Sequence, residues 1–454
     1  MSRRRFLLAL LGVASIVLCA TFTLRPIPSN ADPQRSSADV TAVLLNWARL
    51  SNVVSIVTEL CSPQLATVMK KVVIWNNSPR PIGYNDFVDA HCPPTVLQIH
   101  NSQQNEYFQA RFLACANAST PYCFIQDDDY LVKSEAIRSL RARVEDHDIY
   151  LLPPDEVLSS RLLSINSPST KITFSFSWLG YGALIHRNHA VSFLSLLMRL
   201  GTSQEETRMA DNYYSILRNS FPEIWTSAPI ALSSEGAFTV GDAGVARNNK
   251  HIVAATKYLD SIVANASQAW PYVSRESRDF NHKLQRSPCL GRSCVLESNM
   301  RSLPDILDTF RTAGEIFDHQ ERLGMTLSED ITSTFLNYPL SHAVDADPQT
   351  SFRSVHNIAD GDSLVLDLLD AGPDAVDWVW LVDADTAQVL RTSSYSHSTD
   401  RSSWIESRGS VSCRPSGSLE ECRIPMHRAR FFRMEYRHAN LTFPWRIHET
   451  WLDT

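Results

Sequence analysis

Three consecutive carboxylates, Asp127, Asp128 and Asp129, directly follow a short apolar segment, residues 122–126. Adjacent like charges repel one another, so such a cluster is favoured where a cation neutralises it. Mn²⁺ and Mg²⁺ prefer carboxylate oxygens and bridge them to phosphate groups. In α/β sheets, ligands bind beyond the carboxyl ends of the strands. The triplet therefore predicts a divalent-cation site at the end of a strand. A solvated acidic loop is the alternative, because a bare acidic triplet is a weak motif.

The elements that must position this triplet are read from the hydrophobic pattern. Strands are predicted at residues 41–45, 71–75, 96–100 and 122–126, and helices at 50–60, 105–118 and 134–144. Strands that alternate with helices indicate parallel βαβ units. A more mixed stretch follows, with an alternating strand at 171–178, helices at 190–200 and 211–219, a loop at 241–250 and a helix from His251.

The last third of the chain has a different pattern. A short helix is predicted near residues 304–310, and strand-like segments follow at 363–368, 376–382 and 428–436 with little helical periodicity. This pattern is typical of an all-β sandwich. The predicted fold class is an α/β domain followed by a separate sandwich.

Composition and the N-terminal residues indicate which partners are excluded and where in the cell the protein is expected. The 454 residues carry a net charge of −7, so the basic excess of a nucleic-acid-binding protein is missing. Three arginines at positions 3–5 precede an apolar segment, 6–24, of about the length that spans a bilayer. We expect a cytoplasmic tail (1–5), a transmembrane signal anchor (6–24) and a stem (25–38). A cleaved signal peptide and a twin-arginine signal are the alternatives.

Eight cysteines lie beyond the apolar segment, and an even number is typical of disulfide-bonded proteins in an oxidising lumen. Two local pairs are predicted to form bridges, Cys289 with Cys294 and Cys413 with Cys422; the other pairings stay open. Asn-x-Ser/Thr triplets at Asn117, Asn265 and Asn440 permit glycosylation.

Several segments, in order, resemble the exostosin C-terminal catalytic family of glycosyltransferases. They are residues 43–49, 72–77, the pair Asn105 and Arg111, 127–129, 210–214 and 244–250. This resemblance implies a GT-A (Rossmann-like) fold and a retaining mechanism for a domain at 39–300, followed by a linker at 301–330. Ala210 stands where the family has a second carboxylate. Residues 331–454 resemble a discoidin-like sandwich at 342–352, 364–368 and 429–433.

The resemblance also implies roles for individual residues. Asp129 would ligate Mn²⁺ or Mg²⁺, while Asp127 and Asp128 would reach ribose, or the metal through water. Arg49, Arg111 and Asn76, with its neighbour Asn77, would bind the nucleotide sugar; guanidinium groups bind phosphate bidentately. Asp211 and Arg247 would be catalytic. The alternatives are surface salt bridges for the arginines, a turn for the asparagines and a helix cap for Asp211.

Two functions from different classes follow from these expectations. The first is a metal-dependent retaining glycosyltransferase of the Golgi or ER membrane with a lumenal catalytic domain. It would transfer a sugar, N-acetylhexosamine by resemblance, from a UDP-sugar to a glycan or glycolipid acceptor. The second is a catalytically inactive, membrane-tethered glycan-binding protein, which the missing carboxylate at Ala210 favours.

Overall fold

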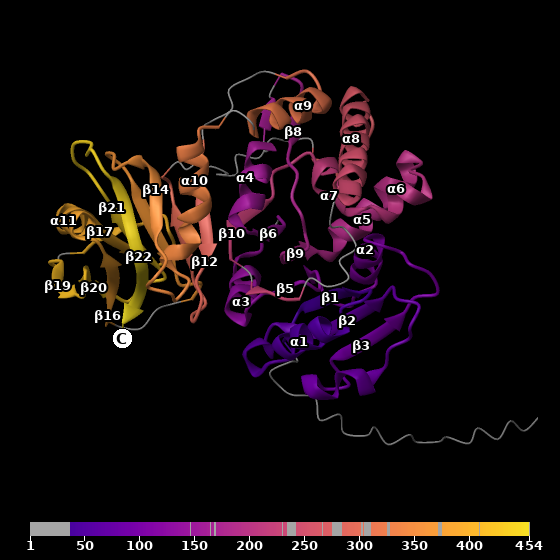
Figure 1. Cartoon of the computed structure of the whole chain (residues 1–454), viewed down its shortest axis with the longest axis horizontal. Helices are drawn as coiled ribbons and strands as arrows, with labels where there is room; N and C mark the ends of the chain where they lie inside the picture. Colours follow the sequence, from indigo (N-terminus) through magenta and orange to yellow (C-terminus); the bar gives the residue numbers. More distant parts are fainter. Residues whose placement is uncertain are drawn as a thin grey trace, which may run out of the picture.

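The computed structural model describes residues 37–145, 147–163, 165–167, 169–228, 230–233, 242–265, 267–274, 284–300, 303, 310–324, 327–370, 375–407 and 409–453. The expected tail, anchor and nearly all of the stem lie outside these residues, as does most of the helix expected near 304–310. Within the described part of the chain, no helix combines the length and the apolar character needed to cross a membrane. Two units lie side by side, an α/β unit and a β-sandwich (Figure 1).

A seven-stranded sheet forms the centre of the α/β unit, with the strand order β10-β6-β9-β4-β1-β2-β3. Its strands are β1 (Val40–Asn46), β2 (Met69–Asn76), β3 (Leu97–Asn101), β4 (Tyr122–Gln126), β6 (Ile149–Leu152), β9 (Ala183–His186) and β10 (Glu223–Thr226). β1 to β4 run parallel, β9 is antiparallel to β4 and β6, and β10 is parallel to β6. The predicted parallel βαβ core is thus present.

Helices cover both faces of this sheet, which explains why its strands are nearly continuous apolar runs. On β4, Cys123 and Ile125 belong to one core and Phe124 to the core on the opposite face. The helices are α1 (Leu50–Leu60), η2 (Pro63–Leu65), η3 (Tyr84–Ala90), α2 (Gln109–Ala116), α3 (Ser134–Arg143), α4 (Pro154–Leu163), α5 (Arg187–Leu200), α6 (Gln204–Arg208), α7 (Asp211–Leu217), α8 (Asp242–Ala264) and α9 (Ala313–Gly324). Two small antiparallel pairs join them, β5 (Tyr130–Leu131) with β11 (Ile230–Ala231) and β7 (Ile165–Ser167) with β8 (Ile172–Phe174).

Three predicted elements differ from the structure. Helix α2 begins four residues later than expected, because Tyr107 has a left-handed backbone (φ 50°) and its N–H bonds the side chain of Asn105 at 2.8 Å. The expected loop at 241–250 is helical from Asp242, since α8 packs against α7 and contains helix-forming alanines. The strand expected at 171–178 is limited to β8.

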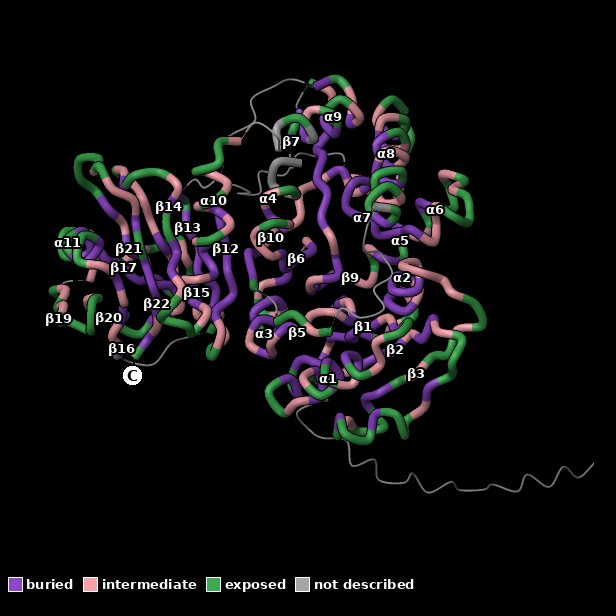
Figure 2. The backbone as a smooth tube through the Cα atoms, in the orientation of Figure 1, coloured by how far each residue is buried: buried purple, intermediate pink, exposed green. Residues whose placement is uncertain are grey.

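The second unit is a sandwich of a six-stranded sheet, β12-β13-β15-β21-β17-β18, and a five-stranded sheet, β14-β22-β16-β20-β19. Trp378, Trp380 and Trp445 are fully buried between the sheets. Figure 2 shows buried residues along the strands of both units. The elements are β12 (Gln285–Pro288), β13 (Val295–Ser298), α10 (Glu329–Asn337), η4 (Leu340–Ala343), β14 (Phe352–Asn357), β15 (Ser363–Asp367), β16 (Ala375–Val382), α11 (Ala384–Thr392), β17 (Ser394–Ser398), β18 (Ile405–Glu406), β19 (Ser412–Ser416), β20 (Leu419–His427), β21 (Phe431–Glu435) and β22 (Pro444–Asp453).

The boundary of the sandwich requires a correction. We expected it at residue 331, but β12 and β13 form a hairpin whose second strand pairs with β15. The hairpin escapes sequence reading because its strands are short and largely polar. The chain then returns to the α/β unit, where α9 buries Ala313, Ile316 and Phe317 in the core against α8. The expected linker at 301–330 therefore contains a structural helix, and the two units are interleaved in sequence.

Buried ion pairs join the two units. Arg143 on α3 contacts Glu297 on β13 at 2.7 Å and Asp367 on β15 at 2.6 Å. Arg286 on β12 contacts Glu223 on β10 at 3.1 Å. The three carboxylates are almost fully buried, so breaking one of these pairs leaves an uncompensated charge and is strongly destabilising. The sandwich is therefore fixed to the edge of the central sheet.

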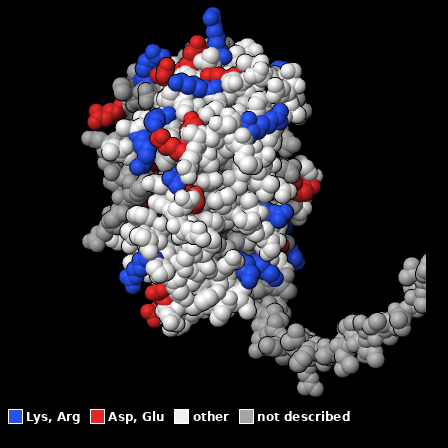
Figure 3. Space-filling model, turned by 90° about the vertical axis from the view of Figure 1, so that its right-hand side faces the viewer, with Lys and Arg blue, Asp and Glu red and all other residues white. Residues whose placement is uncertain are grey.

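Four disulfides join cysteines of the described residues: Cys61–Cys92, Cys115–Cys123, Cys289–Cys294 and Cys413–Cys422. The two predicted local bridges are confirmed. The other two hold α1 to the segment after η3, and α2 to β4. On the face drawn in Figure 3, the described basic and acidic side chains are interspersed.

Candidate functional site

The backbone of the acidic triplet is fixed at the carboxyl end of β4. The N–H of Asp127 donates to the carbonyl of Gly180 at 2.8 Å. The side chain of Asn52 on α1 donates to the carbonyl of Asp128 at 2.8 Å, and the N–H of Leu232 donates to that of Asp129 at 2.8 Å. Because β4 runs parallel to β1, the residues that follow β1 lie at the same edge of the sheet.

Arg111 joins two carboxylates from different elements. Its Nη2 lies 2.6 Å from Asp127 Oδ1, and its Nη1 lies 3.0 Å from Asp211 Oδ2. The Arg111 side chain is 1% exposed, and Asp211, at the start of α7, is also buried. Asp211 is the first helical residue and the cap position is Ala210, so Asp211 is not the helix cap. Arg111 therefore holds the triplet and α7 together.

Arg49, in the loop that follows β1, pairs with the other two carboxylates of the triplet. Its Nη2 lies 2.8 Å from Asp128 Oδ1, and its Nη1 lies 3.4 Å from Asp129 Oδ2. Four carboxylates thus face two guanidinium groups, which leaves two negative charges uncompensated when all are ionised.

The pKa values reflect this excess of negative charge. Burial, opposed by Arg49 and reinforced by the charges of Asp127 and Asp129, raises the pKa of Asp128 to about 7. Burial and the charge of Asp127 raise the pKa of Asp129. Burial also raises the pKa of Asp211 to about 7 despite the opposing charge of Arg111. Groups with such perturbed pKa values cluster at functional sites.

A cleft opens beside these charges. Its lining residues are Leu45, Asn46, Trp47, Ala48, Arg49, Asn77, Asn105, Tyr107, Phe108, Arg111 and the triplet. Trp47, one of the lining residues, is 40% exposed, so its ring is accessible to a ligand in the cleft. The cleft therefore combines basic, acidic and aromatic groups, the chemistry that accepts a phosphorylated ligand with a flat ring.

Comparisons with known proteins give weak likenesses only. No family model and no curated protein matches the chain. Among solved structures, the mannosyltransferase PcManGT from Pyrobaculum calidifontis, in complex with GDP-Man and Mn²⁺, is 14% identical, with a TM-score of 0.32 over 51% of this chain. This chain spans 66% of the length of that protein.

Carbohydrate-binding modules are also weakly similar, over a quarter of the chain. CBM32-1 of a family 31 glycoside hydrolase from Clostridium perfringens is 15% identical, with a TM-score of 0.19 over 25% of this chain and 83% of that one. CpGH89CBM32-5 from the same organism, in complex with GalNAc-β-1,3-galactose, has the same identity and TM-score over 25% and 82%. At these TM-scores neither fold family nor function is established by likeness, and the exostosin resemblance stays a prediction.

Three predicted site residues, Asn76, Asp211 and Arg247, are not among the residues that line the cleft. Asn76 is fully buried, where it accepts a hydrogen bond from Asn46 at 2.7 Å and donates to Asn101 at 2.8 Å. This amide network joins the ends of three neighbouring strands, whereas the adjacent Asn77 does line the cleft. Arg247 lies on α8, not on a loop. The structure thus brings together Arg49, Arg111, Asp211 and the triplet.

From the sequence, Gly180 fits a tight turn or a close approach of the backbone to a donor sugar, but its contact with the triplet is not predicted. A Cβ atom there would lie 2.1 Å from Asp127 Oδ2, so the acidic side chain needs the space that glycine leaves. The Leu-Gly-Tyr-Gly turn was visible in the sequence, but nothing in it indicated contact with the triplet. Trp47, Tyr107 and Phe108 were also missed as lining residues, because single aromatic residues beside a strand or helix carry no distinct pattern.

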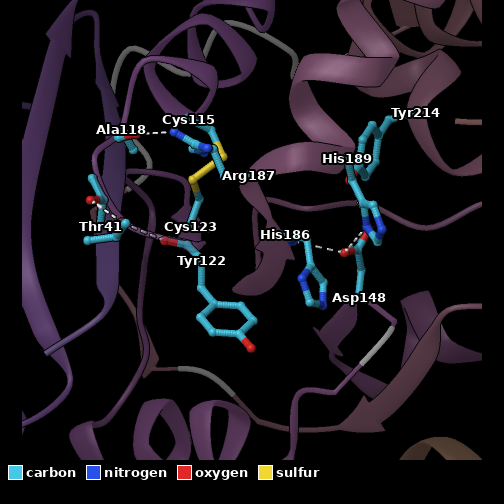
Figure 4. The surroundings of a disulfide bond; sticks show 11 residues. Thr41, Cys115, Ala118, Tyr122, Cys123, Asp148, His186, Arg187, His189 and Tyr214 are labelled. Atoms are coloured by element: carbon cyan, nitrogen blue, oxygen red, sulfur yellow. Dashed lines mark hydrogen bonds and ion pairs between the residues drawn. A yellow bond between two sulfur atoms is a disulfide. The ribbon is translucent and has the colours of Figure 1, made fainter. Parts of the chain in front are cut away.

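The disulfide Cys115–Cys123 gives covalent support to the site (Figure 4). It joins α2, which carries Arg111, to β4, which leads into Asp127. Both cysteines are fully buried. The bridge therefore limits how far Arg111 and Asp127 can separate.

The residues at this edge fit a hard divalent cation. Asp129 Oδ1 and Asp211 Oδ1 are buried and have no hydrogen-bond partner among the described residues. The donor set is carboxylate oxygen, as Mn²⁺ and Mg²⁺ prefer, and two charges need compensation. Among the described residues, one group of three metal-binding side-chain types converges, Cys413, Glu420 and Cys422, but its cysteines form a disulfide. In the triplet, the oxygens are instead divided between two arginines.

Proposed function

We propose that this chain is a metal-dependent, retaining glycosyltransferase with a GT-A fold. It transfers a sugar from a UDP-sugar donor to a glycan or glycolipid acceptor. The observation that carries the proposal is a cleft at the carboxyl edge of a parallel sheet that is lined by the three carboxylates of the triplet and by two arginines, one of which also binds the buried Asp211. This edge is where α/β folds bind phosphorylated ligands.

Individual residues of the chain have different proposed roles in binding the donor. Trp47 and Tyr107 offer flat rings to the nucleoside, and Arg49 binds the diphosphate. The amide of Asn77 instead holds the backbone of Glu106 and Tyr107 beside the cleft. Arg111 keeps Asp127 and Asp211 in position. Asp129, with Asp127 and Asp128, would hold Mn²⁺ or Mg²⁺, which when bound supplies positive charge against the departing diphosphate.

Roles nearer the reacting sugar rest on the exostosin resemblance. Asp211 is the candidate carboxylate beside the anomeric carbon, and Arg247 the candidate cation for the leaving diphosphate. The same resemblance suggests N-acetylhexosamine as the transferred sugar. Four disulfides support an oxidising compartment, the Golgi or ER lumen, with residues 6–24 as the membrane anchor.

Calorimetric titration with UDP, with and without Mn²⁺, tests the proposal. We expect UDP binding that depends on Mn²⁺ and is abolished by Asp129→Asn, because the amide removes one ligand charge. Asp318→Asn, on the exposed face of α9, is the matched control and should bind as the wild type does. Full binding and turnover by Asp129→Asn would refute the metal site.

One observation favours the alternative of an inactive glycan-binding protein. Ala210 is fully buried where a second carboxylate is expected, so the position offers no acidic oxygen to a substrate. A folded protein that binds neither UDP nor Mn²⁺ but is retained on a glycan array would support this alternative.

A further inference from the structure

We propose that Arg49 couples cation binding to nucleotide binding. In the free protein it holds the carboxylates that a divalent cation needs, and a nucleoside diphosphate draws it away from them. The inference rests on the proposed function and adds a form of regulation to the same site.

The contacts of Arg49 place it in direct competition with a cation. Its two terminal nitrogens lie 2.8 Å from Asp128 Oδ1 and 3.4 Å from Asp129 Oδ2. Asp128 and Asp129 both line the cleft together with Arg49. A divalent cation bound to the same carboxylates would lie about 4 Å from the guanidinium, and at that distance the two positive charges repel each other by several kcal/mol even at an intermediate dielectric constant. Arg49 therefore opposes a cation on either of these carboxylates, even on Asp129 Oδ1, which Arg49 does not contact.

Arg49 is also less enclosed by its surroundings than Arg111. Arg111 is 1% exposed and held between carboxylates on β4 and α7. Arg49 is 13% exposed and follows β1 in the loop before α1. The carbonyls of Asp128 and Asp129 are fixed by Asn52 and Leu232, so an exchange of partners involves side chains and not the backbone of the triplet.

A diphosphate provides Arg49 with another partner. Guanidinium groups form paired hydrogen bonds with phosphate oxygens, and Arg49 lines the same cleft as the aromatic residues offered to the nucleoside. Moving Arg49 to the diphosphate frees Asp128 and Asp129 for the cation, and the negative phosphates remove the repulsion between the two cations. Each ligand therefore favours the other, and by linkage the coupling is reciprocal.

The test measures Mn²⁺ affinity by electron paramagnetic resonance on the full-length protein, with and without UDP. For wild type we expect weak binding of Mn²⁺ alone, and binding at least about five-fold tighter with UDP. For Arg49→Gln we expect Mn²⁺ alone to bind at least about five-fold tighter than to wild type, with a smaller effect of UDP. Arg141→Gln on α3, which removes an ion pair with Asp39, is the matched control and should behave as wild type.

Arg49→Lys separates charge from shape. A lysine keeps the competing charge but lacks the paired donors, so Mn²⁺ alone should bind as weakly as to wild type, and UDP should strengthen it less. This variant carries the test if the glutamine variant does not fold. A glutamine variant whose affinity for Mn²⁺ alone is unchanged or lower than wild type, or a lysine variant with full UDP coupling, overturns the inference. Absence of both Mn²⁺ and UDP binding in wild type would instead remove the proposed function itself.

Discussion

Replacing Arg111 by methionine removes the cation that two carboxylates share. Methionine retains an unbranched apolar chain of comparable reach, so packing beside Phe108 is largely kept. The substitution breaks the ion pairs at 2.6 Å to Asp127 and 3.0 Å to Asp211. Arg111 and Asp211 are almost fully buried, and breaking a buried pair by removing one partner costs about 3–5 kcal/mol. Asp127 is 34% exposed and can turn towards solvent, so most of the cost comes from Asp211.

The cost should depend on pH in a defined direction. The pKa of Asp211 is about 7 with Arg111 present, and it rises further when that charge is removed. A carboxylate whose folded pKa lies above its unfolded pKa lowers stability as pH rises between the two values. In the wild type the free energy of unfolding stops falling near pH 7, the folded pKa of Asp211. In the variant it continues to fall above pH 7, because the folded pKa is higher. The deficit in unfolding free energy is therefore small at about pH 6 and grows above pH 7, by about 1.4 kcal/mol for each unit by which the pKa rises.

Urea unfolding followed by circular dichroism, at about pH 6 and about pH 9, measures this deficit. The double variant Arg111→Met/Asp211→Asn should regain most of the loss at the higher pH, because the charge of Asp211 is no longer buried without a partner. Arg141→Met is the control; its pair with Asp39 is about one third exposed, so it should cost no more than about 1 kcal/mol. A deficit that is equal at both pH values, or no recovery in the double variant, would refute the reasoning.

Three further changes test other parts of the structure. Gly180→Ala should lower Mn²⁺-dependent UDP affinity at least about ten-fold with little change in melting temperature, because the new Cβ displaces the Asp127 side chain. Cys115→Ala with Cys123→Ala should lower the unfolding free energy in urea by about 2.5 kcal/mol, the chain-entropy value for so short a loop. Glu449→Gln should leave stability unchanged near pH 5 and raise it above pH 8, measured by thermal unfolding in EDTA, because burial and a neighbouring carboxylate raise the Glu449 pKa to about 8.

Two of these changes have controls elsewhere in the chain. Gly83→Ala meets no atom within 4 Å and should leave UDP affinity unchanged; a similar loss in both glycine variants would contradict the steric account. Removing Cys413 and Cys422 tests a bridge in the sandwich and should leave UDP affinity intact. For Glu449, a stability difference that is larger at pH 5 than above pH 8 would show that the sign is wrong.

The sheet could be predicted because its strands bury both faces. A strand covered by helices on each side is a continuous apolar run, and residues 122–126 show this clearly before the acidic triplet. The β12–β13 hairpin could not be predicted in the same way. Its residues are Gln-Arg-Ser-Pro and Val-Leu-Glu-Ser, and its burial arises from packing between the two units, where Arg286 and Glu297 meet the charges of α3 and β10.

The candidate site was predictable in its residue types but not in its pairings. A strand that ends in three carboxylates already indicates a cation, and this depends only on local sequence. That Arg49 binds Asp128 and Asp129, while Arg111 joins Asp127 to Asp211, depends on how distant elements meet. For Asn76 the residue type was misleading. An amide at the end of a strand fits a ligand site, but the side chains of Asn46 and Asn101, at the ends of the two neighbouring strands, form hydrogen bonds with it instead.

The excess of carboxylates over arginines also predicts that cation binding releases protons. Asp128 and Asp211 each have a pKa of about 7, so each is about half protonated at that pH in the free protein. A cation on the triplet favours the ionised forms, so Mn²⁺ binding should release up to about one proton at pH 7 and almost none at about pH 9. Calorimetry in two buffers with different ionisation enthalpies measures this release directly. Because Asp211 lies behind Arg111, Asp211→Asn should reduce the release only in part, whereas Asp128→Asn should remove most of it. A binding enthalpy at pH 7 that is the same in both buffers would show that these carboxylates are already ionised before the cation arrives.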